Sequence, residues 1–418
     1  MICDLFFLCF LRYCALVCSA EDDAQCGAKA SCKKADKDDL CTYDDMPKPP
    51  SSAHWVPVDS PSFSAQSVCL AVGFTQDGVT GFAGAGSNNV GAQVIKSTDS
   101  GKTWTATPAK QEFNIFLNTA TDTATSAVVS GVIEQEHTTD GEHFVGGGPF
   151  LAPAQDIGIL PSGEFALVGQ TAKGNGVFLS KNGAHYKDAP IPETVLNSTF
   201  ELVRYGAFPT ETTWYITAGA FPENNDGVNG KATAGTADGT QRRRVTHRVS
   251  ISHNDFVIEA PAWSSSSRAR RQAPAPVNCD VDPRNCFAAA IIKTTDGGMT
   301  WTKVYENVNT GDNIYSNGIH CASADHCVAV VEGDSTRILL TRDGGKTWKE
   351  TQHVDDPHAS LVSVRMLDEN EGWVSGGEMS SAFEGRFWHT LDGGDTWNDE
   401  SIKGLYIFSF DMTSRQSG

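Results

Sequence analysis

One eight-residue phrase recurs along this chain and sets the period on which the rest of the sequence is arranged. It reads TLDGGDTW from Thr390, TRDGGKTW from Thr341, TTDGGMTW from Thr294 and STDSGKTW from Ser97. Two shorter copies are TTDGEHF from Thr138 and SKNGAHY from Ser180. Successive copies start 41, 42, 114, 47 and 49 residues apart. Apart from the one long gap, this period matches a single four-stranded blade of a β-propeller.

The order of residues within the phrase predicts a turn between two strands. An Asp carboxylate accepts hydrogen bonds from backbone amides a few residues further on, and the following Gly supplies a positive φ without steric cost. The Thr and Trp that close the phrase suit a half-buried strand. Short apolar stretches such as AAAIIK and GRFWH precede the full copies. We therefore expect the phrase between the third and fourth strands of each blade.

The copies resemble Asp-boxes, also called bacterial neuraminidase repeats. These occur in sialidases, sortilin-like receptors, some glycoside hydrolases and the photosystem II stability/assembly factor family. EGWVSGG followed by HTLDGGDTW is most similar to the blades of that last family, and the similarity spans about residues 60–410. In these families the boxes lie on the outer rim, so the resemblance implies a structural role for the box residues. These are Ser97, Asp99, Gly101, Trp104, Thr294, Asp296, Gly298, Trp301, Thr341, Asp343, Gly345, Trp348, Thr390, Asp392, Gly394 and Trp397.

The predicted fold is an all-β propeller of six to seven four-stranded antiparallel blades, spanning residues 56–418. The long gap between copies predicts an insertion at about 223–285, an excursion within blade four. After Trp397, GLYIFSFDM predicts one strand of a further blade. We therefore expect an incomplete last blade, short of roughly 30 residues. The alternative is that HWVPV near the N-terminus completes a thin seventh blade.

The N-terminal sequence predicts export. Residues 1–20 contain an apolar run that ends in small residues, as in a secretory signal peptide, and 21–55 form a Cys-containing segment. We expect a secreted protein or one in the secretory-pathway lumen, without a membrane span once the signal is removed. The alternative is a plastid lumen, but the acidic EDDAQ after the apolar run is unlike a transit segment.

The cysteines and a sequon agree with export. Eight cysteines remain after residue 20, and the short spacings in CDVDPRNC and HCASADHC make Cys279, Cys286, Cys321 and Cys327 disulfide candidates. A zinc site that adds His320 and His326 is the rival reading, disfavoured because no C-x-x-C pair is present. Asn197 begins an NST sequon and is a glycosylation candidate.

The charge distribution separates the chain's body from its insertion. A formal net charge of −19 argues against nucleic acid as a partner. The insertion, in contrast, is locally basic, and RARRQAP matches a furin-like cleavage pattern at Arg268, Arg270 and Arg271. The alternative for this stretch is a solvated charged loop.

The sequence favours binding over catalysis. Sialidases hold a substrate carboxylate with three arginines, the first in a Phe/Tyr-Arg-Ile-Pro motif that is missing before Ser97. Arg204, Arg337, Arg365 and Arg386 remain candidates to converge on the axis. We predict a non-catalytic propeller that presents loops to a protein or glycan and needs no cofactor or metal. The first alternative is a glycoside hydrolase with an acid pair in the axial cleft, whose residues the sequence does not identify. The second is a photosystem II assembly factor.

Overall fold

The structure is a computed structural model that describes part of the 418-residue chain. The described residues are 7–10, 13–18, 30–35, 38–43, 68–87, 91–111, 116–131, 135–147, 156–171, 173–196, 202–220, 287–308, 314–333, 335–356, 359–378, 385–401 and 407–413. The chain divides into two compact units, Met1–Pro57 and Val58–Gly418.

The first unit contains one four-stranded sheet in the order β1-β2-β4-β3. Its strands are β1 (Phe7–Phe10), β2 (Tyr13–Cys18), β3 (Ala30–Ala35) and β4 (Asp38–Tyr43). The first two lie within the predicted signal peptide, which stays a prediction. Among the described residues of the chain, no helix is both long enough and apolar enough to cross a bilayer.

The second unit contains six four-stranded antiparallel sheets, the blades. Blade one has β5 (Val68–Phe74), β6 (Gly81–Ser87), β7 (Gly91–Ser97) and β8 (Thr105–Gln111). Blade two has β9 (Phe116–Thr123), β10 (Ser126–Gly131), β11 (Gln135–Thr138) and β12 (Val145–Gly146). Blade three has β13 (Asp156–Ile159), β14 (Phe165–Thr171), β15 (Gly174–Ser180) and β16 (Lys187–Pro190), followed by the short helix α1 (Glu193–Leu196).

The other three blades follow the same pattern. Blade four has β17 (Leu202–Ala207), β18 (Trp214–Ala220), β19 (Ala288–Thr294) and β20 (Thr302–Asn307). Blade five has β21 (Ile314–Cys321), β22 (Cys327–Gly333), β23 (Thr336–Thr341) and β24 (Lys349–Val354). Blade six has β25 (Ala359–Met366), β26 (Gly372–Glu378), β27 (Gly385–Thr390) and β28 (Asn398–Asp399).

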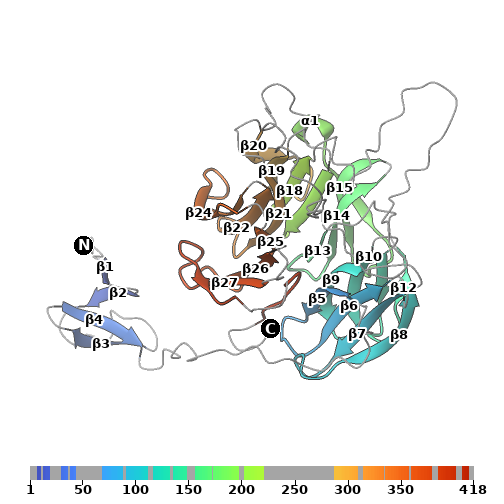
Figure 1. Cartoon of the computed structure of the whole chain (residues 1–418), viewed down its shortest axis with the longest axis horizontal. Helices are drawn as coiled ribbons and strands as arrows, with labels where there is room; N and C mark the ends of the chain where they lie inside the picture. Colours follow the sequence, from blue (N-terminus) through green and yellow to red (C-terminus); the bar gives the residue numbers. More distant parts are fainter. Residues whose placement is uncertain are drawn as a thin grey trace, which may run out of the picture. The chain divides into compact units, whose positions relative to one another are not determined.

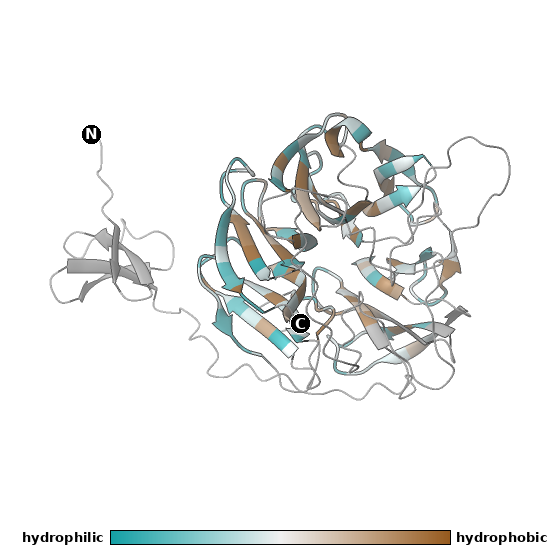
Figure 2. Cartoon of the chain, turned by 45° about the horizontal axis from the view of Figure 1, so that its top comes forward, coloured by the Kyte–Doolittle hydropathy of each residue, from teal (hydrophilic) through white to brown (hydrophobic). Residues whose placement is uncertain are grey.

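The predicted fold class is confirmed, with six blades around a common centre (Figures 1 and 2). Every blade is a meander in which neighbouring strands in sequence are neighbours in the sheet. Each of the six copies of the phrase, from here on called a repeat turn, connects the third strand of a blade to the fourth. The expected position of the phrase, between the third and fourth strands of each blade, is therefore confirmed.

The core lies between neighbouring blades, because the middle strands are buried on both faces. In β14, Ala166 and Val168 pack toward blade four, whereas Phe165 and Leu167 pack toward blade two. Alternate side chains of a strand point to opposite faces, so one strand serves two interfaces. This explains why these strands read as continuous apolar runs.

The long gap between repeat turns falls inside blade four, as predicted. Its second strand, β18, ends at Ala220, and its third, β19, begins at Ala288 and pairs with β18 along its whole length. The intervening 223–285 lies outside the described residues.

The stretch expected to begin a further blade packs against blade six instead. Residues 407–413, the closing segment, form no strand. Instead, Met412 packs on Trp373 and Phe387 of blade six, with Ile407 and Phe410 against the same cluster. The prediction of a strand there was wrong, because the stretch fills the space beside blade six with side chains rather than extending a sheet.

Candidate functional site

The repeat turn of blade four shows how its fixed residues act together. Thr294 Oγ1 donates to Asp296 Oδ1 at 2.8 Å and accepts the amide of Gly298 at 3.0 Å. Asp296 in turn accepts the backbone amide of Thr300 at 2.8 Å and its hydroxyl at 2.6 Å. Trp301 Nε1 donates to the Gly298 carbonyl at 3.1 Å. Each fixed side chain of the phrase thus bonds to another part of the same turn.

The other full copies repeat the hydrogen bonds of the Asp, whereas the Trp Nε1 donates to the Gly carbonyl of its own turn at Trp104 and to Thr351 at Trp397. The Asp carboxylates accept the Thr amide four residues on at 2.9 Å, in the turns of Asp99, Asp343 and Asp392. Hydrogen bonds from the hydroxyl and then the amide of that Thr lower the pKa of Asp296 and Asp343 to about 2. In the shorter copy at Ser180, the side-chain oxygen of Asn182 accepts two amides in the same way, at 3.0 and 3.1 Å. An acceptor oxygen, rather than a charge, is therefore what this position needs.

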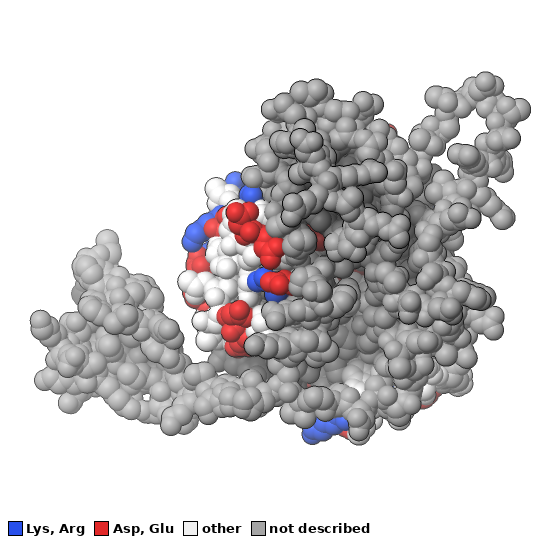
Figure 3. Space-filling view, in the orientation of Figure 1, with Lys and Arg blue, Asp and Glu red and all other residues white. Residues whose placement is uncertain are grey.

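The repeat turns also pack against the neighbouring blade. Gly298 has a φ of +85°, and a Cβ there would lie 2.9 Å from the Cβ of Ala189 in blade three and 3.0 Å from the Trp214 ring. Lys293 of blade four contacts the repeat turn of blade five, where its Nζ donates a hydrogen bond to the Gly344 carbonyl at 2.9 Å. Figure 3 shows acidic and basic side chains interspersed on the described surface in view. The described turns thus make contacts between blades.

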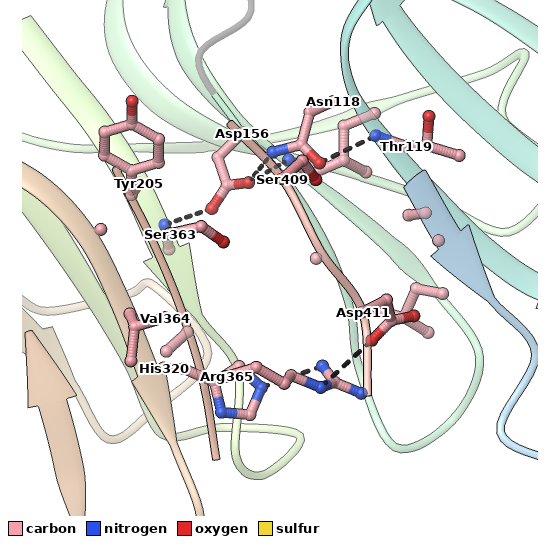
Figure 4. A pocket seen from close by; sticks show the side chains of 18 of the residues that line it. Asn118, Thr119, Asp156, Tyr205, His320, Ser363, Val364, Arg365, Ser409 and Asp411 are labelled. Carbon is pink, nitrogen blue, oxygen red and sulfur yellow. Dashed lines mark hydrogen bonds and ion pairs between the residues drawn. The ribbon is translucent and has the colours of Figure 1, made fainter. Parts of the chain in front are cut away.

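A cavity with a volume of about 790 Å³ lies instead on the axis. Residues of the first strand of every blade line it, together with the closing segment, and no fixed Asp or Trp of the repeat turns does. Figure 4 shows its polar residues, which include Asn118, Asp156, His320, Arg365 and Asp411. This axial pocket is the candidate functional site.

Asp156 occupies one side of the axial pocket and joins three blades. Its carboxylate accepts the amide of Gly206 at 2.9 Å, that of Ile157 at 2.9 Å, and a hydrogen bond from the Asn118 side chain. Burial raises the pKa of Asp156 to about 6, although these three donors lower it. The carboxyl group is therefore protonated more readily than that of an exposed aspartate.

Arg365 and Asp411 form a second polar corner, which lies apart from Asp156 in Figure 4. Asp411 Oδ2 accepts the amide of Phe74 at 2.8 Å, so it connects the closing segment to blade one. Asp411 Oδ1 lies 3.3 Å from Arg365 Nε, an ion-pair distance without hydrogen-bond alignment. The other edge of the guanidinium contacts His320, with Nη1 at 3.0 Å from Nε2.

His320 faces a donor at each ring nitrogen. Besides Arg365, the amide of Met366 lies 3.2 Å from its Nδ1. A neutral imidazole has one acceptor nitrogen, so it can satisfy one of these donors and not both. Burial and the charge of Arg365 hold the pKa of His320 well below its ordinary value. The positive charge in this corner therefore belongs to Arg365.

A third acid, Asp122, also lines the axial pocket. Burial raises its pKa. Within the described parts of the chain, its carboxylate has no hydrogen-bond or ion-pair partner. Of the three acids that line the described pocket, Asp122 is thus the one that remains unengaged.

The four candidate arginines do not converge. Arg365 alone lines the pocket. Arg204 donates to Asn317 at 3.3 Å, Arg337 pairs with Glu350 at 3.3 Å, and Arg386 pairs with Glu378. A three-arginine carboxylate clamp is therefore not assembled by these residues. Sequence reasoning missed Asp156 and Asp411, since neither belongs to a repeated motif.

The other candidate residues divide between described and undescribed parts of the chain. Cys321 and Cys327 form a disulfide at the end of the β21–β22 hairpin. Their sulfurs are consequently not thiolate ligands, and His326 Nε2 lies 2.8 Å from the Gly393 carbonyl. Across the described residues, no group of three or more His, Cys, Asp or Glu is placed to hold a metal ion. The remaining candidates, Cys279, Cys286, Asn197, Arg268, Arg270 and Arg271, lie outside the described residues.

No protein-family model and no curated protein matches the chain. Solved structures that it resembles include YCF48 bound to D1 peptide, at 13% identity over 82% of this chain and 88% of that one, with a TM-score of 0.43. YCF48 from Cyanidioschyzon merolae is 15% identical over 74% of this chain and 92% of that one, with a TM-score of 0.34. The GH74 xyloglucanase from Xanthomonas campestris is 11% identical over 78% of this chain and 45% of that one, with a TM-score of 0.49. Similarities at this level carry no argument about a ligand or an activity.

Proposed function

We propose that this chain is an exported, non-catalytic binding propeller that holds a segment of a protein or a glycan in its axial pocket. The observation that carries the proposal is the state of the acids that line this pocket. Asp156 is held by three donors, and Asp411 is held by Arg365 and the Phe74 amide. Both carboxylates thus already serve contacts between parts of the propeller.

This arrangement favours binding over glycoside hydrolysis. A glycosidase needs two carboxylates across the cleft, one as a general acid and the other as a base or nucleophile. Asp122 is the one acid of the described pocket without a partner, so a second free carboxylate is missing there. A cavity of about 790 Å³ with polar groups at its wall is of a size that accommodates a short peptide segment or a small oligosaccharide.

Binding in the axial pocket is tested by filling it. Ser363 lines the pocket and is partly exposed, so Ser363→Trp should occupy the cavity. Thr347→Trp places the same side chain on an exposed repeat turn and serves as the control. On peptide and glycan arrays, we expect binding by the native chain and the control, and loss with Ser363→Trp. Undiminished binding by the filled variant would rule out the axial pocket as the binding site.

One observation favours the glycoside hydrolase as the second candidate. The pKa of Asp156 is raised to about 6, and a raised pKa is what a general acid needs. Incubation with oligosaccharides and measurement of new reducing ends tests this reading. Reducing ends that form with the native chain and disappear with both Asp156→Asn and Asp122→Asn would establish hydrolysis in place of simple binding.

Export is part of the proposal and rests on the N-terminal sequence. A fluorescent tag at the C-terminal end should enter the secretory pathway in cells. Accumulation of the tagged protein in a plastid would contradict the assignment and favour the assembly-factor alternative.

A further inference from the structure

The interface between blades six and one is built differently from the other five. Each first strand packs against the first strand of the next blade from β5 and β9 onward to β21 and β25. No such packed pair joins β25 to β5 among the described strands. The closing segment lies there instead, and its Met412, which is 6% exposed, packs on Trp373 and Phe387.

The closing segment is attached without a strand ladder. Its backbone amide at Ile407 donates to the Gly376 carbonyl at 3.1 Å, and the Ile407 carbonyl accepts the Ser375 hydroxyl at 3.1 Å. Phe410 adds an edge-to-face contact with Phe387, at 5.2 Å between ring centroids. Because the segment belongs to no strand ladder, it can leave without unpairing the strands of a blade.

Asp411 places a carboxylate in a corner whose donors come from two other elements. The amide of Phe74 belongs to β5, and the guanidinium of Arg365 belongs to β25. Backbone amides and guanidinium groups are the donors with which proteins bind carboxylates. The corner therefore has the chemistry of a carboxylate site, and Asp411 is its present occupant.

The pairing between Asp411 and Arg365 leaves room for a better one. A guanidinium matches a carboxylate best when two parallel N–H groups donate to its two oxygens. Asp411 instead offers one oxygen, Oδ1, at 3.3 Å from Nε, and the Arg365 side chain is 39% exposed. A carboxylate that takes the place of Asp411 can pair with the guanidinium through two bonds.

The occupant also indicates the class of competitor. It is a stretch of polypeptide in which the carboxylate of Asp411 stands between the apolar side chains of Phe410 and Met412. Those apolar side chains pack on blade six. A protein segment can supply both the carboxylate and its apolar flanks, whereas a uronate of a glycan supplies the carboxylate alone.

We propose that this corner of the axial pocket is a carboxylate site for an acidic, apolar-flanked segment of a protein partner, and that Asp411 occupies it until the partner displaces the closing segment. This inference rests on the binding function proposed above. It predicts that the native chain is partly self-inhibited, because its own segment competes for the same donors.

The test uses the full chain and a labelled peptide of sequence IFSFDMT, blocked at both ends so that its Asp holds the one carboxylate. Binding is followed by fluorescence anisotropy. Asp411→Asn keeps the shape of the resident side chain and removes its charge, which weakens the competitor. Asp355→Asn, at an exposed acid outside the pocket, is the matched control.

We expect the peptide to bind Asp411→Asn about tenfold more tightly than the native chain, as one charge-assisted hydrogen bond is worth at least that factor. Asp355→Asn should behave as the native chain does. The gain should vanish in Asp411→Asn/Arg365→Met, and with the peptide IFSFNMT.

Equal binding by the native chain and Asp411→Asn would overturn the proposal, and so would a gain that survives Arg365→Met. Oligogalacturonate that displaces the peptide more effectively than unlabelled IFSFDMT would refute the protein partner in favour of a glycan. If Asp411→Asn does not fold, hydrogen exchange on the native chain gives the answer: excess IFSFDMT must accelerate exchange within 407–413. The proposed function fails separately, through Ser363→Trp, whose result does not depend on Asp411.

Discussion

Replacing the buried hydroxyl of one repeat turn should destabilise its blade by a predictable amount. Thr341 is 1% exposed, and its Oγ1 accepts the buried amide of Gly345 at 2.9 Å. Thr341→Val keeps the size and β-branching of the side chain but leaves this amide without its acceptor. An unsatisfied buried donor costs about 1–3 kcal/mol, so we expect the free energy of unfolding to fall by about 2 kcal/mol.

Thr347→Val supplies the control within the same turn. Its Oγ1 donates to Asp343 at 2.7 Å, but this hydrogen bond is exposed, so water replaces the lost partner. Urea denaturation of both variants gives the difference, and hydrogen exchange should be faster at the Gly345 amide in Thr341→Val alone. A loss in Thr347→Val as large as that in Thr341→Val would refute the claim that buried amide satisfaction stabilises the turn.

Three further outcomes are expected. Gly376→Ala should lower the urea midpoint strongly, because its Cβ would meet the Ser360 carbonyl oxygen at 2.0 Å, whereas Gly219→Ala meets nothing closer than 3.4 Å and should not. Burial lowers the pKa of His389, but hydrogen bonds and charges of two carboxylates, Glu400 and Glu371, outweigh it and raise the pKa above 6.5. The stability that His389 contributes is therefore fully present below pH 6.5 and is lost as the pH rises through the folded-state pKa. Urea titrations at about pH 6 and about pH 9 should show this loss in the native chain and a smaller one in His389→Gln. Loss of the Cys321–Cys327 disulfide should lower the free energy of unfolding by about 2 kcal/mol. Urea denaturation of Cys327→Ser tests this, and a midpoint equal to that of the native chain would contradict it.

The repeat turns allowed the fold to be predicted because they report on local chemistry. An acid, a glycine of positive φ and an aromatic anchor specify one turn wherever they occur, and their spacing counts the strands between them. The insertion was located for the same reason, since the 114-residue gap between the copies at Ser180 and Thr294 marks the blade that carries the extra residues.

The axial pocket could not be predicted in this way. Asn118, Asp156 and Gly206 lie on the first strands of three different blades and meet through closure of the ring. The available signal was position: side chains of first strands line the axis, so Arg365 in β25 was a better pocket candidate than Arg337 in β23 or Arg386 in β27.

The closing segment shows where a sequence pattern can mislead. Its alternation, with apolar Phe408, Phe410 and Met412 around polar Ser409 and Asp411, is that of a half-buried strand. The same alternation also suits a chain that fills an interface with its apolar side chains and points a carboxylate toward donors. Which of the two forms depends on whether a strand edge or an unfilled interface lies beside it, and neither is visible in the local sequence.

The contrast between rim and axis bears on where function should be sought. Four repeat turns use nearly the same residues, so the blades that carry them are chemically alike at the rim. They are not alike at the pocket, because its ionisable groups each come from a different element: Asp122 from blade two, Asp156 from blade three, His320 from blade five, Arg365 from blade six and Asp411 from the closing segment. A ligand recognised by such a wall must itself be asymmetric. For this reason, variants at the unrepeated first-strand positions should alter binding specificity, whereas variants in the repeat turns should alter stability and leave specificity unchanged.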